Sequence, residues 1–149
     1  MLKWILAVLM LGLVVALVLP RIASDDVERW HIDPRTAQPE DKPNSYLVAD
    51  YDAVRVPLSP TDALARVDAM ALAEPRTSRL EANGTMATYV QRSALFGFPD
   101  YISVHAEPDG DGSRLSFFSR SRYGYSDMGV NKARVERWLA DLQSNAATN

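Results

Sequence analysis

The longest apolar stretch of the chain lies at its amino end. Residues 4–20 carry no charge, and residues 5–19 are all apolar. As a helix, this charge-free stretch spans roughly 25 Å, slightly less than a typical hydrocarbon core. Lys3 and Arg21 flank it, and their long side chains can reach water from either end. We therefore predict a single transmembrane signal-anchor helix over residues 1–20.

A cleaved signal peptide is the alternative interpretation, because a basic start followed by an apolar run also fits one. A cut after Ala16 would leave apolar residues 17–19 on the mature terminus, and a cut after Ala23 would place Arg21 where a small residue is needed. We favour the uncleaved anchor. Lys3 precedes the helix and acids follow it, which predicts a cytoplasmic N-terminus. We expect a single-pass protein of a bacterial inner (cytoplasmic) membrane with its domain in the periplasm.

The next stretch, residues 21–44, carries prolines and many acidic residues. It contains Pro34, Pro39 and Pro43, and it shows no apolar periodicity. Such a composition favours an extended chain over a helix or a strand. We predict an extended acidic tether here, which lifts the domain off the bilayer or lies along another protein.

A strand and a helix open the predicted domain. Valines alternate with an arginine within residues 53–58, which is typical of a strand. Ser59 then has the properties of a helix N-cap, and Pro60 fits the first helical position. Leucine, valine and alanine at helical spacing give this helix one buried face, and Pro75 ends it.

Four strands and a second helix follow. The dipeptide Asn83-Gly84 between two apolar segments predicts a tight hairpin. Two further strands are expected around residues 101–106 and 115–121, and a last helix over about residues 132–142 with Asn131 as its N-cap.

The order of elements predicts the fold class. A strand, a helix, four antiparallel strands and a final helix (β-α-β-β-β-β-α) indicate an α+β fold. We expect a curved antiparallel sheet with both helices packed on one face, preceded by the transmembrane helix. The domain is predicted over residues 45–143 and a disordered tail over residues 144–149.

Composition narrows the possible chemistry. The chain has no cysteine, which excludes disulfides, zinc-thiolate sites and thiol catalysis. A formal net charge of −3 argues against nucleic acid as a partner. Asp109 and Asp111 have the opening spacing of a calcium loop, but Arg114 and Arg120 replace its glycine and its bidentate acid. No serine has a nucleophile-elbow context. We expect no metal, no cofactor and no enzymatic activity.

Charge is polarised along the sequence. Residues 114–137 hold six basic and two acidic residues, whereas residues 25–62 hold four basic and nine acidic ones. Guanidinium groups on one strand face could bind a phosphate, a carboxylate or an anionic lipid. The alternative, which we favour, is pairing with the domain's own Asp100 or Asp127. The candidate residues for binding an anion or a partner are Arg92, Arg120, Arg122 and Arg134.

A glycine-rich connection links the last strand to the last helix. Its glycines permit backbone angles that other residues avoid, and its aspartate can accept hydrogen bonds from the amides of the turn. We interpret it as a structural turn motif rather than an anion site. The motif comprises Gly124, Tyr125, Ser126, Asp127, Gly129 and Asn131.

This region also carries a family resemblance. Residues 119–134 read SRSRYGYSDMGVNKAR, and Arg92-Ser93 is followed by Phe-Gly-Phe. The pattern resembles the signature of the bacterial and plastid domain-of-unknown-function family 1499, over roughly residues 43–142. Two departures are Ser45, where the family usually has a cysteine, and Asp100, where it usually has two acids. The resemblance implies the domain and no particular activity.

Two functions of different classes fit the pattern. The first is a non-catalytic interaction domain held at the bilayer, an accessory or assembly subunit of a membrane protein complex. The second is a binding module for a lipid or another small apolar or anionic ligand. Five aromatic residues could line such a pocket: Tyr89, Phe96, Phe98, Phe117 and Trp138.

Overall fold

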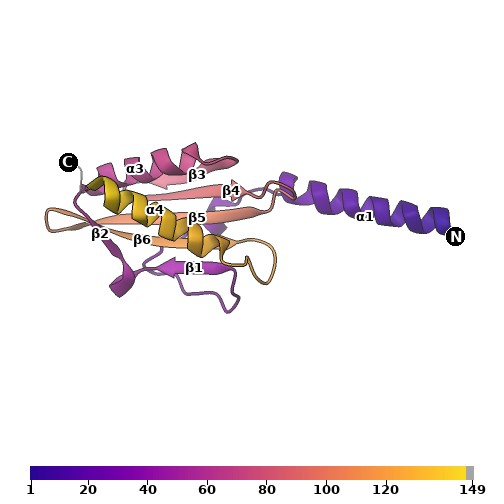
Figure 1. Cartoon of the computed structure of the whole chain (residues 1–149), viewed down its shortest axis with the longest axis horizontal. Helices are drawn as coiled ribbons and strands as arrows, with labels where there is room; N and C mark the ends of the chain where they lie inside the picture. The colour runs from indigo at the N-terminus through magenta and orange to yellow at the C-terminus, as the bar shows by residue number, and fades with distance from the viewer. Residues whose placement is uncertain (147–149) are drawn as a thin grey trace.

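A long helix projects from one end of an α+β domain. The computed structural model describes residues 1–146, of which α1 (Leu2–Ile22) forms the projection (Figure 1). Among these residues, α1 is the one helix long and apolar enough to cross a membrane, and none of its most apolar window is buried. By length and composition α1 fits a membrane span and a signal sequence alike.

The domain is built on a six-stranded antiparallel sheet. Four long strands form its centre and one edge, in the spatial order β6-β5-β4-β3. Two short strands lie end to end along the other side of β6. The strands are β1 (Ser45–Val48), β2 (Val54–Val56), β3 (Thr77–Asn83), β4 (Met86–Arg92), β5 (Pro99–Asp109) and β6 (Gly112–Ser121).

The edge beside β6 holds a strand that the sequence pattern did not predict. β1 pairs with β6 from Ser45 opposite Arg120 to Val48 opposite Phe117. A short 3₁₀ helix, η1 (Asp50–Asp52), separates β1 from the predicted strand β2. With only four residues, β1 is too short to show a reliable alternation. The predicted order is confirmed with this one strand added in front.

Both main helices cover the same face of the sheet, as predicted (Figure 1). α3 (Pro60–Ala73) begins as expected, because Ser59 Oγ accepts a hydrogen bond from the amide of Asp62. α4 (Val130–Ala146) packs beside α3. The core between helices and sheet comprises mainly Val56, Val67, Ala71, Tyr89, Ile102, Val104, Leu115, Phe117, Val135, Trp138 and Leu142.

The predicted hairpin is present, with its turn shifted by one residue. Asn83 still pairs with Met86, so Gly84 and Thr85 form the two-residue turn. Gly84 has a φ of 52°, a left-handed conformation that glycine adopts without a steric penalty.

The start and end of α4 differ from the prediction. Asp127, not Asn131, caps the helix: its carboxylate accepts hydrogen bonds from the amides of Gly129 (2.9 Å) and Asn131 (2.7 Å). Asn131 is the second residue of the helix, and its side chain is buried. The helix also continues to Ala146, so the predicted disordered tail overlaps it at residues 144–146. Residues 147–149 of that prediction lie outside the described residues.

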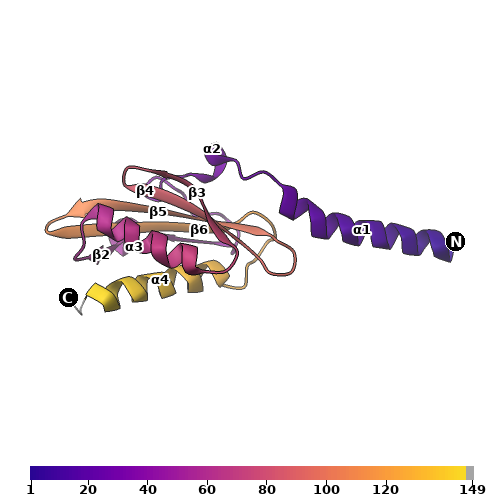
Figure 2. The ribbon, with the colours of Figure 1, turned by 90° about the horizontal axis from the view of Figure 1, so that it is seen from above.

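Part of the segment predicted as a tether packs on the domain. Residues 24–37, which we call the strap, lie on the face of the sheet opposite α3 and α4, and they include the short helix α2 (Val27–Trp30) (Figure 2). Trp30 is buried against Tyr101 and Val90 of that face. A sheet with helices on one side only would leave these apolar side chains in water, and the strap covers them.

Candidate functional site

Two of the predicted arginines hold the strap where α1 enters the domain. Arg92 forms an ion pair with Asp25 (2.7 Å), and it donates a hydrogen bond to the carbonyl of Pro20 (2.8 Å). Arg122 donates to the carbonyl of Ser24 (2.9 Å). The Tyr101 hydroxyl completes the cluster by donating to Asp25 (2.6 Å). Burial raises the pKa of Tyr101 to about 12, and the neighbouring carboxylate of Asp25 acts in the same direction.

The third arginine lies deeper under the strap. Arg120 is 1% exposed, and it donates a hydrogen bond to the carbonyl of Trp30 (2.7 Å). Its guanidinium lies 5.3 Å from the ring centre of Trp30 and 4.4 Å from that of Phe118, within the range of cation–π contacts. Burial lowers its pKa to about 10. Among the described residues, no carboxylate lies within ion-pair distance of Arg120.

Arg134 lies on the other face of the sheet, under the helices. It is 3% exposed and forms an ion pair with Asp100 (2.8 Å). It also donates hydrogen bonds to Gln91 (2.9 Å), Ser119 (3.1 Å) and Asn131 (2.8 Å). The four predicted arginines therefore form two separate groups. Asp100 compensates Arg134, and Asp25, which the sequence reasoning missed, compensates Arg92. Anion binding by these arginines stays a prediction.

The glycine-rich turn is hydrogen-bonded to the residues around Arg134 and Asn131. Gly124 and Gly129 have φ values of 90° and 82°, as the sequence suggested. The side chain of Asn44 donates to the carbonyl of Gly124 (2.9 Å) and so ties β1 to the turn. Tyr125 is 71% exposed and donates no hydrogen bond within this network.

Asn131 is the centre of that network. Its side-chain amide nitrogen donates to the carbonyl of Asn44 (3.1 Å) and to Ser121 Oγ (3.0 Å). Its side-chain oxygen accepts a hydrogen bond from Ser119 Oγ (2.5 Å). We expect Asn131→Ala to lower the free energy of unfolding by about 2–3 kcal/mol, because several buried partners lose their hydrogen bonds together. Urea titration followed by circular dichroism measures the loss. Ser126→Ala, in the exposed part of the turn, is the control, and equal losses would contradict this role.

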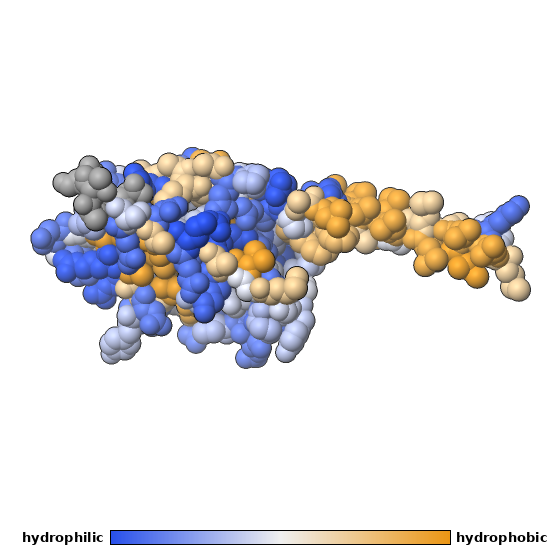
Figure 3. Space-filling model, viewed as in Figure 1, coloured by the Kyte–Doolittle hydropathy of each residue, from blue (hydrophilic) through white to orange (hydrophobic). Residues whose placement is uncertain are grey.

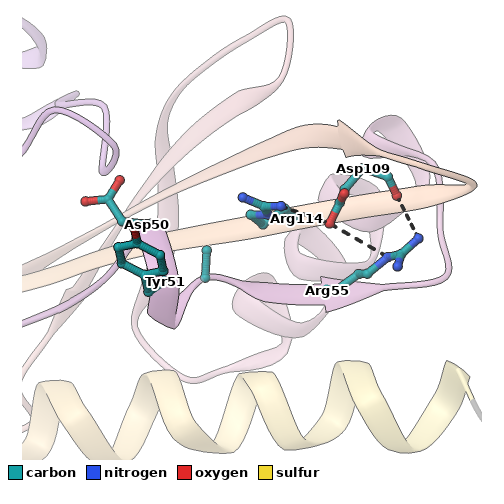
Figure 4. A pocket seen from close by; sticks show the side chains of 6 residues that line it. Asp50, Tyr51, Arg55, Asp109 and Arg114 are labelled. Carbon is teal, nitrogen blue, oxygen red and sulfur yellow. Dashed lines mark hydrogen bonds and ion pairs between the residues drawn. The ribbon is translucent and has the colours of Figure 1, made fainter.

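A surface hollow lies beside η1, at the interrupted edge of the sheet (Figure 4). It has a volume of about 670 Å³ and is open to solvent. On one side Arg55 and Arg114 both point toward the carboxylate of Asp109, at 3.7 and 3.3 Å. Two guanidinium groups therefore occupy the surroundings of Asp109, where a calcium loop would place further oxygen ligands. Within residues 1–146, no three histidine, aspartate or glutamate side chains are grouped as a metal site.

The other side of the hollow carries a fully exposed aromatic residue. Tyr51 lies at the middle of η1 and makes almost no contact with the rest of the chain. Its neighbour Asp50 has a φ of 52°, an uncommon conformation for a residue other than glycine. Sequence reasoning missed this corner, although the segment Asp50-Tyr51-Asp52 places an aromatic between two acids where a strand breaks.

Comparison with known protein families matches most of the chain to one family. The family model described as a protein of unknown function (DUF1499) matches residues 24–142, which is most of the chain. The chain belongs to the DUF1499 family. No curated protein matches it.

The extent of the DUF1499 match agrees with the structure. It begins at Ser24, the first residue of the strap, about 19 residues before the resemblance seen in the sequence. It ends at Leu142, whose side chain is the last core residue of α4. The strap is thus part of the DUF1499 domain, and α1 lies outside it.

Proposed function

We propose that this protein is a single-pass membrane protein of the bacterial inner membrane whose DUF1499 domain docks, without catalysis, on a membrane protein complex from the periplasmic side. α1 supports the anchor, because its apolar surface is exposed along its length and needs an apolar environment. The junction supports a fixed placement of the domain, since Arg92 connects the carbonyl of Pro20 at the end of α1 to Asp25 in the strap.

The observation that carries the docking role is the corner at η1. A tyrosine held out by a strained turn, beside a hollow with two arginines, has the composition of an interaction hot spot. Tyrosine and arginine contribute most to such interfaces, because they combine a large apolar area with hydrogen-bonding groups. The corner also interrupts the sheet edge, which discourages a second copy from adding as a strand.

The ligand-binding alternative has less support. Of the aromatic residues expected to line a pocket, Phe117 and Trp138 are buried in the core, where they pack against neighbouring side chains. Phe96 and Phe98 stack on each other in the loop between β4 and β5, outside the core (ring centres 5.2 Å apart). Tyr89 contacts Trp138 edge-on (6.1 Å).

Gentle detergent extraction of the full chain tests the docking role. We expect the wild type to migrate with a discrete larger complex, and Tyr51→Ala to lose that association while its melting temperature stays unchanged, since Tyr51 supports nothing within the domain. Leu72→Ala is the control, because Leu72 is an exposed apolar residue on α3. Release without detergent would contradict the anchor, and association retained by Tyr51→Ala would contradict the corner as the docking surface.

A further inference from the structure

Exposed apolar and aromatic side chains gather at the end of the domain from which α1 emerges. They lie on two loops, residues 93–98 between β4 and β5 and residues 122–129 between β6 and α4. In both ribbon views the two loops project from the sheet toward α1 (Figures 1 and 2). The exposed members are Leu95 (66%), Phe98 (37%), Tyr123 (37%), Tyr125 (71%) and Met128 (94%).

The two loops form one surface. The ring of Phe98 contacts that of Tyr123 with centres 5.4 Å apart, which joins the loops across the end of the sheet. Phe96 stacks on Phe98 behind them. Figure 3 shows apolar surface at this end of the domain, close to the base of the helix. We call these five exposed side chains the apolar rim.

The first of the two loops is bonded to the end of α1. The guanidinium of Arg21, in the last turn of α1, donates hydrogen bonds to the carbonyls of Leu95 and Phe96. Arg92 contacts the carbonyls of Pro20 and Gly97 at 2.8 and 3.2 Å, so it joins the helix end to the same loop. The loop of residues 93–98 is thus fixed beside the point where the apolar sequence ends.

If α1 spans a bilayer, its apolar stretch is shorter than the hydrocarbon core. The charge-free stretch covers roughly 25 Å, whereas a hydrocarbon core is about 30 Å thick. A short span draws its flanking residues toward the headgroups. Because the loop of residues 93–98 is bonded to the end of α1, it is drawn there too, and the contact between Phe98 and Tyr123 brings the second loop with it. Tyrosine and other amphipathic aromatics are favoured at that depth, where one end of the ring is apolar and the other is wet.

We propose that the apolar rim enters the headgroup region of the bilayer beside α1 and forms a second membrane contact that fixes the orientation of the domain. This inference rests on the proposed anchoring by α1. The occupant is lipid, because the rim continues the apolar surface of the helix at its membrane boundary. The domain then stands with its strands leading away from the bilayer, and the turn at Gly110-Asp111 lies at its far end.

The absence of cysteine makes the test direct, since each introduced cysteine is a unique labelling site. Single variants Leu95→Cys, Met128→Cys, Asp111→Cys and Leu13→Cys of the full chain would carry a nitroxide label, in vesicles of phosphatidylcholine and phosphatidylglycerol. Collision rates of the label with oxygen and with a water-soluble nickel chelate report its depth. Leu13 in α1 tests the anchor, and Asp111 is the water-exposed control.

We expect the Leu95 and Met128 labels to show a severalfold loss of nickel collisions relative to the Asp111 label, and the Leu13 label to be reached by oxygen alone. If Leu13 is in lipid while Leu95 and Met128 match Asp111, the rim contact is overturned and the anchor stands. If the Leu13 label is itself exposed to nickel, the anchor fails and the rim contact fails with it.

Discussion

Replacing Trp30 with alanine is expected to lower the free energy of unfolding by about 3–5 kcal/mol. Trp30 is 6% exposed and stacks on Tyr101 with ring centres 3.9 Å apart and planes within 7°. The substitution removes this contact, opens a cavity over the sheet and uncovers the buried guanidinium of Arg120. Circular dichroism of the full chain in detergent, titrated with urea, measures the change.

Val27→Ala provides the matched control in the same short helix. Val27 is 36% exposed, so replacing it with alanine should cost less than about 1 kcal/mol of unfolding free energy. A tether that only spans a gap would tolerate both substitutions equally. Equal midpoints for Trp30→Ala, Val27→Ala and the wild type would therefore contradict the strap as part of the folded domain.

Arg134→Ala is expected to cost a similar amount, about 3–5 kcal/mol, because it breaks a buried ion pair by removing one partner. Asp100 is left with an uncompensated carboxylate, and Gln91, Ser119 and Asn131 lose a donor. Thermal unfolding of the full chain gives the comparison.

Lys132→Ala is the control on the same helix. Lys132 pairs with Glu136 at 3.7 Å, and both side chains are more than half exposed, so the expected loss is below about 0.5 kcal/mol. If Arg134→Ala melts like Lys132→Ala, the network under α4 does not stabilise the domain as its geometry indicates.

The sequence predicted the helix starts and turns that depend on a few neighbouring residues. Ser59 and Pro60 specified the start of α3, and Asn83-Gly84 specified the hairpin, because a cap or a tight turn depends on a few adjacent residues. Strand alternation also correctly predicted that Arg120 and Arg122 lie on the same side: both donate to the strap, although β6 ends at Ser121 and Arg122 is the next residue.

Contacts between distant residues were not predictable in the same way. Trp30 lies in a proline-rich, acidic segment, and its partners Tyr101 and Arg120 come 71 and 90 positions later. Charge alone grouped Arg134 with the other arginines, although α4 carries it to the opposite face of the sheet. The sequence indicated that Asp127 accepts hydrogen bonds from amides of the turn, but it placed the helix cap at Asn131, because both residue types are common caps.

The position of the strap sets an order of events during synthesis. Residues 24–37 leave the ribosome before the rest of the domain, yet the surface that holds them is made of β4, β5 and β6, the last of which ends at Ser121. The strap therefore stays undocked until the last strand has been made and paired. Contacts between residues so far apart in the sequence slow folding. Until the strap docks, Trp30 is exposed, and exposed apolar side chains of this kind are bound by chaperones.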